Sequence, residues 1–396
     1  MGNGKKKLLI VNNNLATGGV QRSLINLLHE IKDTYEVTIF VFSHSGEYKN
    51  RISPDATVIE ASPLLRLLGM SQAQTKDMGY RYYYIRAVLA LYAKIVSNHL
   101  AIRLLLLTQE KLTGFDIAIS FLHNAGEKSL YGGCNEFVLR RVKAKEKMTF
   151  LHCDFSNYGG DTLKNRKTYR QFDKIATVSE GCQQSFCEAV PELAAKTQCV
   201  INCHDYGDYI SQANDNPIEY PESRLNIVTI ARLSPEKGIL RAVDVINRLA
   251  KEGRLVRWHI VGDGVQRKEI ENSIDQCKAS EHIILYGNQE NPYRYLKNAD
   301  LLFLPSFHEA APMVFDEAKC LGIPIMTTHT TSAKEMVAEG KEGFVSENSE
   351  NGIYKTLKSI LDNPRGLQVC REYLLQQQYS NEKALLQFHS LIDERN

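Results

Sequence analysis

The sequence has 396 residues, of which 43% are hydrophobic and 24% are charged, and its formal net charge is +2 at pH 7. This composition is typical of soluble globular proteins with a sizeable core and excludes a disordered or fibrous chain, and the small net charge does not favour nucleic acid as a partner. A chain of this length favours two domains.

The nine cysteines are scattered, without paired Cys-x-x-Cys spacing, which argues against a zinc site and suits a reducing cytoplasm. No signal-peptide pattern precedes the first strand, so we expect a cytoplasmic protein. Residues 1–205 contain 26 Lys and Arg against 19 Asp and Glu. This excess favours an anionic surface or ligand facing the N-terminal half.

Short apolar runs alternate with helical patterns along the chain. The expected strands are 8–11, 37–41, 117–120, 148–151, 175–178, 227–230, 258–261, 283–286, 301–304 and 323–326. Such runs predict parallel sheets covered on both faces, and therefore two doubly wound domains with a cleft between them at the carboxyl ends of the strands.

The predicted domains are residues 1–205 and 206–375, followed by a helical tail, 376–396, for which we consider packing against the N-terminal domain. The polar stretch 205–224 contains two prolines and is predicted to be the interdomain linker.

In the N-terminal half, polar residues follow two of the expected strands. His123 and Asn124 follow one strand, and His152 and Asp154 follow the next. Since ligands bind at the carboxyl ends of parallel strands, all four are candidates to face the cleft. A histidine that caps the following turn is the alternative for His152.

Residues 80–107 are rich in Tyr, Leu and Arg, and Arg86, Lys94 and Arg103 interrupt the apolar pattern. No run approaches the ~18–20 apolar residues that a membrane span needs. Two interpretations stay open: a basic amphipathic helix on an anionic membrane surface, and a helix packed on the N-terminal domain. We favour the second.

Two cations follow the strand 227–230. Arg232 and Lys237 lie in a strand–helix turn that ends at Gly238. A planar guanidinium and a compact ammonium at such a turn can neutralise a diphosphate.

Two glutamates follow the strand 301–304. Pro312 suits the first turn of a helix, where the amides of Met313 and Val314 are unpaired and can receive an anion. Glu309 precedes this turn, and Glu317 lies roughly 7–9 Å into the helix at 1.5 Å per residue. This line of groups fits a sugar, a diphosphate and a ribose, although surface helices commonly carry solvated glutamates.

The segment 306–318, with seven residues between Glu309 and Glu317, resembles the signature of retaining family 4 glycosyltransferases of the GT-B fold. The resemblance covers most of the chain and is strongest over 226–348. It implies that Glu309 contacts the hydroxyls of the donor sugar, that Glu317 holds the ribose, and that the loop with Arg232 and Lys237 contacts the leaving group.

The same resemblance assigns weaker roles. It places Gly262 at the nucleotide pocket and Tyr286 or Asn288 at the base, and it places His152 near the donor sugar. The turn Gly18-Gly19, which we expect to be too close to the first helix for bulky side chains, would bring its backbone toward the phosphates or the acceptor.

One departure concerns Ala310 and Ala311, where the family often has Gly-Phe. Alanine adopts positive φ less readily than glycine, which puts the loop's backbone donors to the sugar in doubt.

The resemblance implies a retaining, metal-independent hexosyltransferase that uses a nucleotide sugar, with UDP preferred. No Asp-x-Asp motif or His/Glu cluster predicts a metal site, and no cofactor is expected. Likeness to bacterial capsule and exopolysaccharide transferases suggests a saccharide or polyprenyl-linked acceptor at the inner face of the membrane.

Three alternatives remain. A sugar-nucleotide epimerase of the same architecture would release nucleotide without an acceptor. A nicotinamide-dependent dehydrogenase would need Gly-x-Gly-x-x-Gly after the first strand, which is absent there. A non-catalytic binding relative is kept open by the two alanines.

Overall fold

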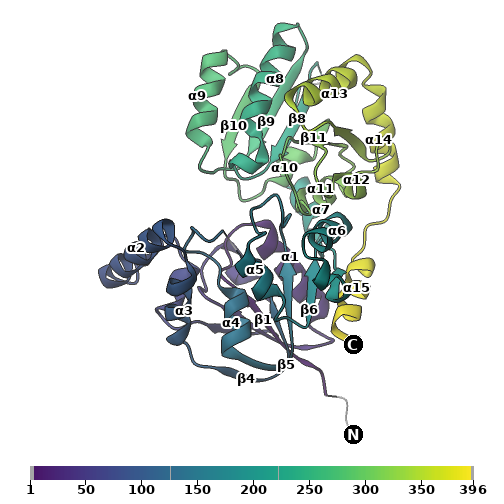
Figure 1. Ribbon diagram of the computed structural model, residues 1–396. Coiled ribbons are helices and arrows are strands. Elements are labelled where there is room, and N and C mark those ends of the chain that lie inside the picture. Colours follow the sequence, from purple (N-terminus) through teal and green to yellow (C-terminus); the bar gives the residue numbers. More distant parts are fainter. Residues whose placement is uncertain (1–3, 125, 222, 394–396) are drawn as a thin grey trace. The chain divides into compact units, whose positions relative to one another are not determined.

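The computed structural model describes residues 4–124, 126–221 and 223–393, which form two compact units (Figure 1). The chain leaves the first unit after Cys203 and returns to it at Asn381, and the residues between form the second unit.

The first unit is built on a seven-stranded parallel sheet of order β3-β2-β1-β4-β5-β6-β7. Its strands are β1 (Lys7–Asn12), β2 (Glu36–Val41), β3 (Thr57–Glu60), β4 (Leu112–Ser120), β5 (Val142–Leu151), β6 (Lys174–Thr177) and β7 (Thr197–Cys199).

Both faces of this sheet are buried. Alternate residues of β1 enter two different apolar clusters: Leu8 and Ile10 face one, and Leu9 and Val11 face the other. A strand covered on both sides needs continuous apolar residues, which explains why it reads as an uninterrupted run in the sequence.

The helices of this unit are α1 (Gly19–Ile31), α2 (Tyr80–Ile95), α3 (His99–Leu107), α4 (Cys134–Arg141), α5 (Leu163–Tyr169), α6 (Glu180–Ala189) and α15 (Glu382–Asp393). The last of these returns from the far end of the chain to cover one face of the sheet, where Phe388 and Leu391 are fully buried. Lys174 on β6 donates a hydrogen bond to the Leu391 carbonyl at 2.7 Å.

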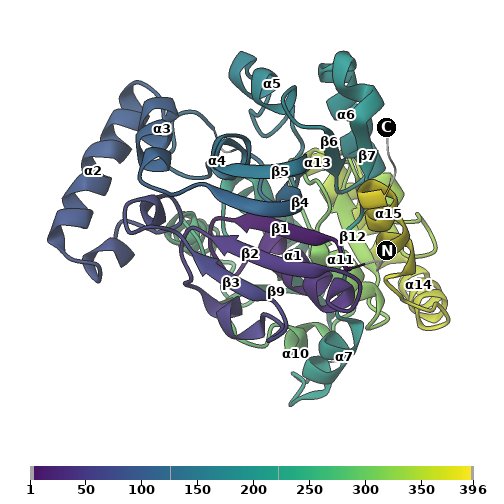
Figure 2. The same ribbon diagram turned by 90° about the horizontal axis from the view of Figure 1, so that it is seen from below.

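The segment 80–107 forms two helices, and α2 projects from the edge of the unit (Figures 1 and 2). Ala93 is the single fully buried residue of α2, although several others are half-buried. The expected packing on the N-terminal domain is present along one side of α2, where Tyr82, Leu89 and Ala90 contact the core, and its outer side is exposed.

The second unit has a six-stranded parallel sheet of order β10-β9-β8-β11-β12-β13. Its strands are β8 (Leu225–Ile230), β9 (Val256–Val261), β10 (Ile283–Gly287), β11 (Leu301–Leu304), β12 (Ile325–Thr328) and β13 (Gly343–Ser346). The helices are α7 (Tyr206–Asn214), α8 (Ile239–Lys251), α9 (Arg267–Cys277), α10 (Tyr293–Leu296), α11 (Met313–Lys319), α12 (Ala333–Met336), α13 (Glu350–Asp362) and α14 (Arg365–Leu375).

The predicted linker is wrong in its first half. Residues 206–214 form α7, and the buried side chains of Tyr209 and Ala213 join the apolar core of the second unit. Tyr209 packs on Tyr293 with ring centroids 5.1 Å apart. Because only these two side chains of the largely polar α7 are buried, the sequence contains no apolar run that would have predicted the helix.

Each expected strand is present, and the prediction of two doubly wound α/β domains is confirmed. The edge strands β3, β7 and β13 were not predicted. They are only three or four residues long, and Thr, Gln, Glu or Ser interrupts their apolar pattern.

Candidate functional site

The order of strands in the second sheet reverses at β8 and β11. The chain runs outward from β8 through β9 and β10, and then returns to the other side of β8 as β11. Loops that leave two such neighbouring strands diverge and create the place where ligands bind in open parallel sheets. Both predicted charged motifs follow these two strands.

A largely buried ion pair joins the two motifs. Lys237 Nζ lies 2.6 Å from Glu309 Oε1, and the two side chains are only 17% and 9% exposed. The same carboxylate oxygen accepts a hydrogen bond of 2.6 Å from the buried Ser306 hydroxyl. Burial of a charge requires such partners, so the loop after β11 is held in one conformation by the loop after β8.

A second cation anchors the backbone of the same loop. Arg241 on α8 donates to the Pro305 carbonyl through Nε at 3.1 Å and Nη2 at 2.6 Å, and to the Ser306 carbonyl at 2.9 Å. Its guanidinium also lies over the Phe307 ring, 3.9 Å from the centroid. Burial lowers the pKa of Arg241. This arginine positions the loop, since its donors are taken by the protein itself.

Glycines let these loops approach one another. A Cβ on Gly238 would lie 2.1 Å from the Pro305 carbonyl oxygen, and one on Gly262 would lie 1.9 Å from the Ala231 carbonyl oxygen. Both glycines have positive φ, at +63° and +139°. The three loops after β8, β9 and β11 therefore interlock through their backbones, which only glycine permits.

Arg232 lies on the same loop as Lys237, but it is exposed. Its guanidinium is 3.6 Å from Glu236, and 74% of its side chain is accessible. Glu236 in turn accepts a hydrogen bond of 2.6 Å from the Ser234 hydroxyl. Burial raises the pKa of Glu236, but the Ser234 bond and the nearby Arg232 and Lys237 outweigh it, so the pKa is lowered overall.

The segment that follows Glu309 runs into α11. Neither Ala310 nor Ala311 has a positive φ, so alanine fits this loop without backbone strain. Pro312 precedes the helix, and Met313 and Val314 are its first two residues, as predicted. Glu317 lies in this helix and is 3% exposed. The expected location of these residues is confirmed, whereas their contacts with a ligand remain predictions.

Tyr286, the penultimate residue of β10, lies in an aromatic cluster. Its hydroxyl lies 2.9 Å from Nδ1 of His259, on which its ring stacks, and Tyr295 packs on it from another side. Burial lowers the pKa of His259 to about 4. Asn288 follows in an exposed turn. The Tyr286 hydroxyl is thus engaged, and a role at the base would fall to the ring or to Asn288.

In the first unit, His152 follows β5 as expected. Its ring packs against Phe121 and Phe150, with centroids 4.7 and 5.7 Å away. Burial, followed by the nearby His123, lowers its pKa to about 3, so the imidazole is neutral at pH 7. Its Nε2 is buried and has no hydrogen-bond partner among the described residues. A neutral ring nitrogen without a partner suits contact with a hydroxyl.

His123, Asn124 and Asp154 differ in how accessible they are. His123 is half-buried and packs edge-on against Tyr158. Asp154 is 1% exposed, and its carboxylate accepts hydrogen bonds from the backbone and side-chain amides of Asn157.

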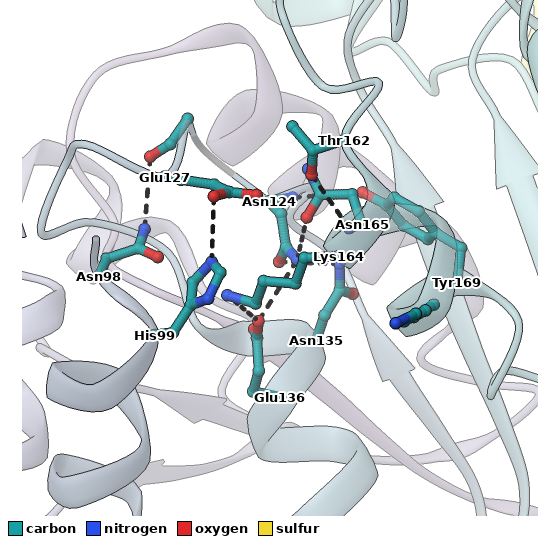
Figure 3. Close-up of polar contacts among 12 residues, drawn as sticks. Asn98, His99, Asn124, Glu127, Asn135, Glu136, Thr162, Lys164, Asn165 and Tyr169 are labelled. Carbon is teal, nitrogen blue, oxygen red and sulfur yellow. Dashed lines mark hydrogen bonds and ion pairs between the residues drawn. The ribbon is translucent and has the colours of Figure 1, made fainter. Parts of the chain in front are cut away.

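Asn124 belongs to a buried polar network (Figure 3). Its side-chain nitrogen donates to Asn165 at 3.0 Å and to Glu136 at 3.4 Å, and its oxygen accepts from Asn135 at 3.0 Å. These bonds hold the loop after β4 against α4 and α5. The structure thus gives Asn124 a positioning role in place of the expected open location.

The Gly18-Gly19 turn lies close to the first helix, since a Cβ on Gly18 would lie 2.7 Å from Oε1 of Gln21 on α1. The φ of Gly18, 175°, is extended, and the contact is with a flexible side chain rather than with the backbone. Gly19 begins α1. Space therefore does not demand glycine at position 18.

Sequence reasoning missed Ser306 and Arg241, which hold the loop after β11, together with Asn348, whose amide donates to the Phe307 carbonyl at 2.8 Å. Arg241 offered a signal, because it interrupts the inward face of α8 formed by Ile239, Ala242, Val243 and Ile246. A cation at such a position needs buried acceptors.

Among the described residues, no cluster of three or more His, Cys, Asp or Glu side chains is arranged to hold a metal ion. None of the described helices has the length and apolar character needed to cross a membrane.

Comparison with known proteins finds one family model that matches most of the second unit. Residues 211–377 match the family model of glycosyl transferases group 1. The chain is 26% identical over 160 residues to the putative colanic acid biosynthesis glycosyltransferase WcaL of Escherichia coli strain K12, which is 38% of this chain and 39% of that protein.

A Campylobacter jejuni protein is 26% identical over 141 residues, 35% of this chain and 38% of its own length. Its name is N-acetylgalactosamine-N,N'-diacetylbacillosaminyl-diphospho-undecaprenol 4-alpha-N-acetylgalactosaminyltransferase. The matches to these two relatives thus span about two fifths of their lengths.

Solved structures extend the likeness to the whole chain. Anabaena HepE in complex with UDP-glucose superposes with a TM-score of 0.65 at 15% identity, covering 98% of both chains. Such a distant likeness shows the fold. This chain therefore resembles the glycosyl transferases group 1 family through residues 211–377, about two fifths of its length, and it has the GT-B fold.

Proposed function

We propose that this protein is a retaining glycosyltransferase that moves a hexose-type sugar from a nucleotide diphosphate sugar, with UDP preferred, to a saccharide or lipid-linked acceptor in surface polysaccharide synthesis. The observation that carries the proposal is the largely buried Lys237–Glu309 pair at the point where the strand order of the second sheet reverses. The name of the relative WcaL, which refers to colanic acid biosynthesis, supports a polysaccharide product, and the HepE complex with UDP-glucose supports a UDP-sugar donor.

The donor would bind by exchanging partners within this pair. A diphosphate oxygen accepts hydrogen bonds from Lys237 and from the exposed Arg232, and the Glu309 carboxylate, still held by Ser306, turns to accept from a sugar hydroxyl. The first amides of α11 add donors to the phosphate, and Glu317 takes the ribose hydroxyls.

In the reaction, the bond between the anomeric carbon and the diphosphate oxygen breaks, and the acceptor hydroxyl attacks from the same face. Its proton passes to a departing phosphate oxygen. Arg232 and Lys237 stabilise the negative charge that grows on the leaving group, which is where fixed cations lower a barrier most. We assign the acceptor to the first unit, with His152 and His123 as contacts, while Gly262 shapes the nucleotide pocket.

A thermal-shift panel of UDP-, GDP- and ADP-sugars tests the donor. A ligand at one hundred times its dissociation constant stabilises the folded state by about 2.7 kcal/mol. UDP-sugars should raise the melting temperature of the native protein and not of Lys237→Ala. The proposed site would be contradicted if no donor raised the melting temperature of the native protein, or if the donors raised that of Lys237→Ala equally.

Turnover separates transfer from simple binding. Lys237→Ala should reduce kcat by about 100-fold or more, because it removes a charge that acts on the leaving group. Arg254→Ala is the matched control, since Arg254 forms an ion pair of the same 2.6 Å length with Asp362 at the surface of the same unit. Donor binding without transfer to any acceptor would favour a non-catalytic relative, and release of nucleotide with an altered sugar would favour an epimerase.

A further inference from the structure

The outer sides of α2 and α3 are apolar and exposed to solvent. We call these two consecutive helices the hairpin and this surface the hairpin face. It consists of Tyr80, Tyr84, Val88, Leu91 and Ile95 on α2 and Leu100, Leu104 and Leu107 on α3. Several of these side chains, such as Val88 at 67% and Ile95 at 66%, are about two-thirds exposed.

The spacing makes the hairpin face continuous along each helix. At about 100° per residue, the five positions on α2 fall within a sector of about 80°. Ala93, which is buried, and Leu89, which packs against the core of the unit, lie on the opposite side. A helix that is apolar on its packed side and on its outer side is prepared for a second apolar contact.

The charge of this segment indicates which partner the hairpin face binds. Residues 78–109 contain no Asp or Glu and four Lys or Arg. Arg86 turns inward and donates to the Leu67 carbonyl at 3.2 Å, whereas Arg81, Lys94 and Arg103 are exposed. On the helical wheel, Arg81 and Lys94 fall on the two sides of the apolar sector. Long basic side chains beside an apolar stripe can reach phosphate groups while the stripe enters the lipid.

A second copy of the chain fits this charge less well, because two hairpin faces in contact would bring basic residues together without acidic partners. A membrane span is excluded for α2, which has 16 residues. We propose that the hairpin face binds the surface of a bilayer that contains anionic phospholipid.

Hydrogen bonds also join the hairpin to the loop after β4, which carries the proposed acceptor contact His123. Lys128 Nζ donates to the last carbonyls of α2, those of Ile95 and Val96, at 2.9 and 2.8 Å. The side chain of Asn98 donates to the Ser129 carbonyl at 2.9 Å, and His99 pairs with Glu127 at 3.4 Å (Figure 3). Residues 126–129 belong to the loop after β4 that carries His123. If the proposed function holds, docking places this loop at the surface where a lipid-linked acceptor resides.

Flotation with vesicles tests the proposal without any reaction. The native protein should float with vesicles of equal parts phosphatidylcholine and phosphatidylglycerol, should stay behind with pure phosphatidylcholine, and should be released by high salt. Val88→Asp combined with Leu91→Asp should reduce the bound fraction by about tenfold or more, since both positions are exposed and lose apolar contact with lipid. Leu386→Asp, at an exposed leucine of α15, is the control and should float normally.

A second variant tests the charge. Arg81→Glu combined with Lys94→Glu leaves the apolar stripe intact and should abolish the preference for phosphatidylglycerol. Equal flotation of the native protein and the Val88/Leu91 variant would overturn the proposal. So would a dimer in sedimentation that the same variant converts to monomer, since the face would then bind a second copy. Failure of the transferase proposal would appear only in the donor assays and would leave flotation unchanged.

Discussion

At the scale of single residues, Gly262 shows how closely the loops of the second unit approach. Its φ is +139°, and a Cβ would lie 1.9 Å from the Ala231 carbonyl oxygen. Gly253 also has a positive φ, +76°, but nothing lies within 4 Å of its Cβ position. Replacing Gly253 by alanine therefore introduces backbone strain alone, whereas replacing Gly262 introduces both strain and steric overlap.

We expect Gly262→Ala to lower the free energy of unfolding by about 3 kcal/mol or more, because the backbone of a neighbouring loop must move. Gly253→Ala should cost about 1–2 kcal/mol, the strain of a left-handed alanine alone. Urea denaturation of both variants measures the difference. Equal costs would mean that the loops after β8 and β9 are not interlocked.

His152 gives stability a dependence on pH. Burial and the nearby His123 lower its pKa from the ordinary value of 6.5 to about 3. A base with a lowered pKa stabilises the folded chain while it is neutral. This contribution is fully present above the unfolded pKa of about 6.5 and is lost as the pH falls toward about 3.

His152→Phe should therefore lose less stability than the native protein between pH 7 and pH 5, because a phenyl ring can keep the packing on Phe121 and Phe150 without taking up a proton. Denaturant titrations at the two pH values measure this. The matched change His259→Phe removes a second buried histidine, whose pKa is about 4, and reports on the second unit. An unchanged dependence in His152→Phe would show that its imidazole titrates normally.

Residue types and spacing were enough to locate Arg232, Lys237, Glu309 and Glu317, because the loops and the helix that carry these charges follow strands that are visible as apolar runs. They could not reveal that Lys237 and Glu309 touch, since the pair joins loops 72 positions apart. The partners of Arg241 could not be predicted from the sequence either. Two backbone carbonyls accept from this side chain, and carbonyls leave no trace in a sequence.

At the scale of elements, the buried strands and the apolar edge strand β10 were predictable, whereas the edge strands β3, β7 and β13 were not. The interior strands have apolar residues on both faces, whereas β3 (TVIE) resembles a loop because it is short, partly exposed and polar at both ends. The position of α15 was open for a different reason. Its apolar positions predict a helix with one buried side, but the surface that covers this side lies far away in the sequence.

That surface is the first sheet, and α15 completes its core. Phe388 is fully buried there and packs edge-on against Tyr35, with ring centroids 6.1 Å apart. We expect Phe388→Ala to lower the free energy of unfolding by about 3–5 kcal/mol, as for other buried aromatic residues. Leu386→Ala, at a position that is 65% exposed on the same helix, should change it by less than about 0.5 kcal/mol. Chemical denaturation of both variants decides whether α15 is part of the core, and similar small effects would show that it is not.

At the scale of the whole molecule, the chain divides into two units with separate cores. The second is continuous in sequence, from His204 to Ser380, and it contains all the groups of the proposed donor site. The first is discontinuous, because it needs α15 from the end of the chain. The two units should therefore respond differently to being separated.

We expect a fragment of residues 204–380 to unfold cooperatively and to keep the thermal shift caused by the preferred nucleotide sugar, because its core and the Lys237–Glu309 pair are complete within it. It should transfer no sugar, since the proposed acceptor residues are absent. A fragment of residues 1–203 should be unstable, and linking residues 381–396 to it should restore a cooperative transition, because Phe388 and Leu391 then refill the core. Differential scanning calorimetry of the three fragments measures these outcomes. A folded second fragment that fails to bind any donor accepted by the full chain would show that the first unit supplies part of the donor site.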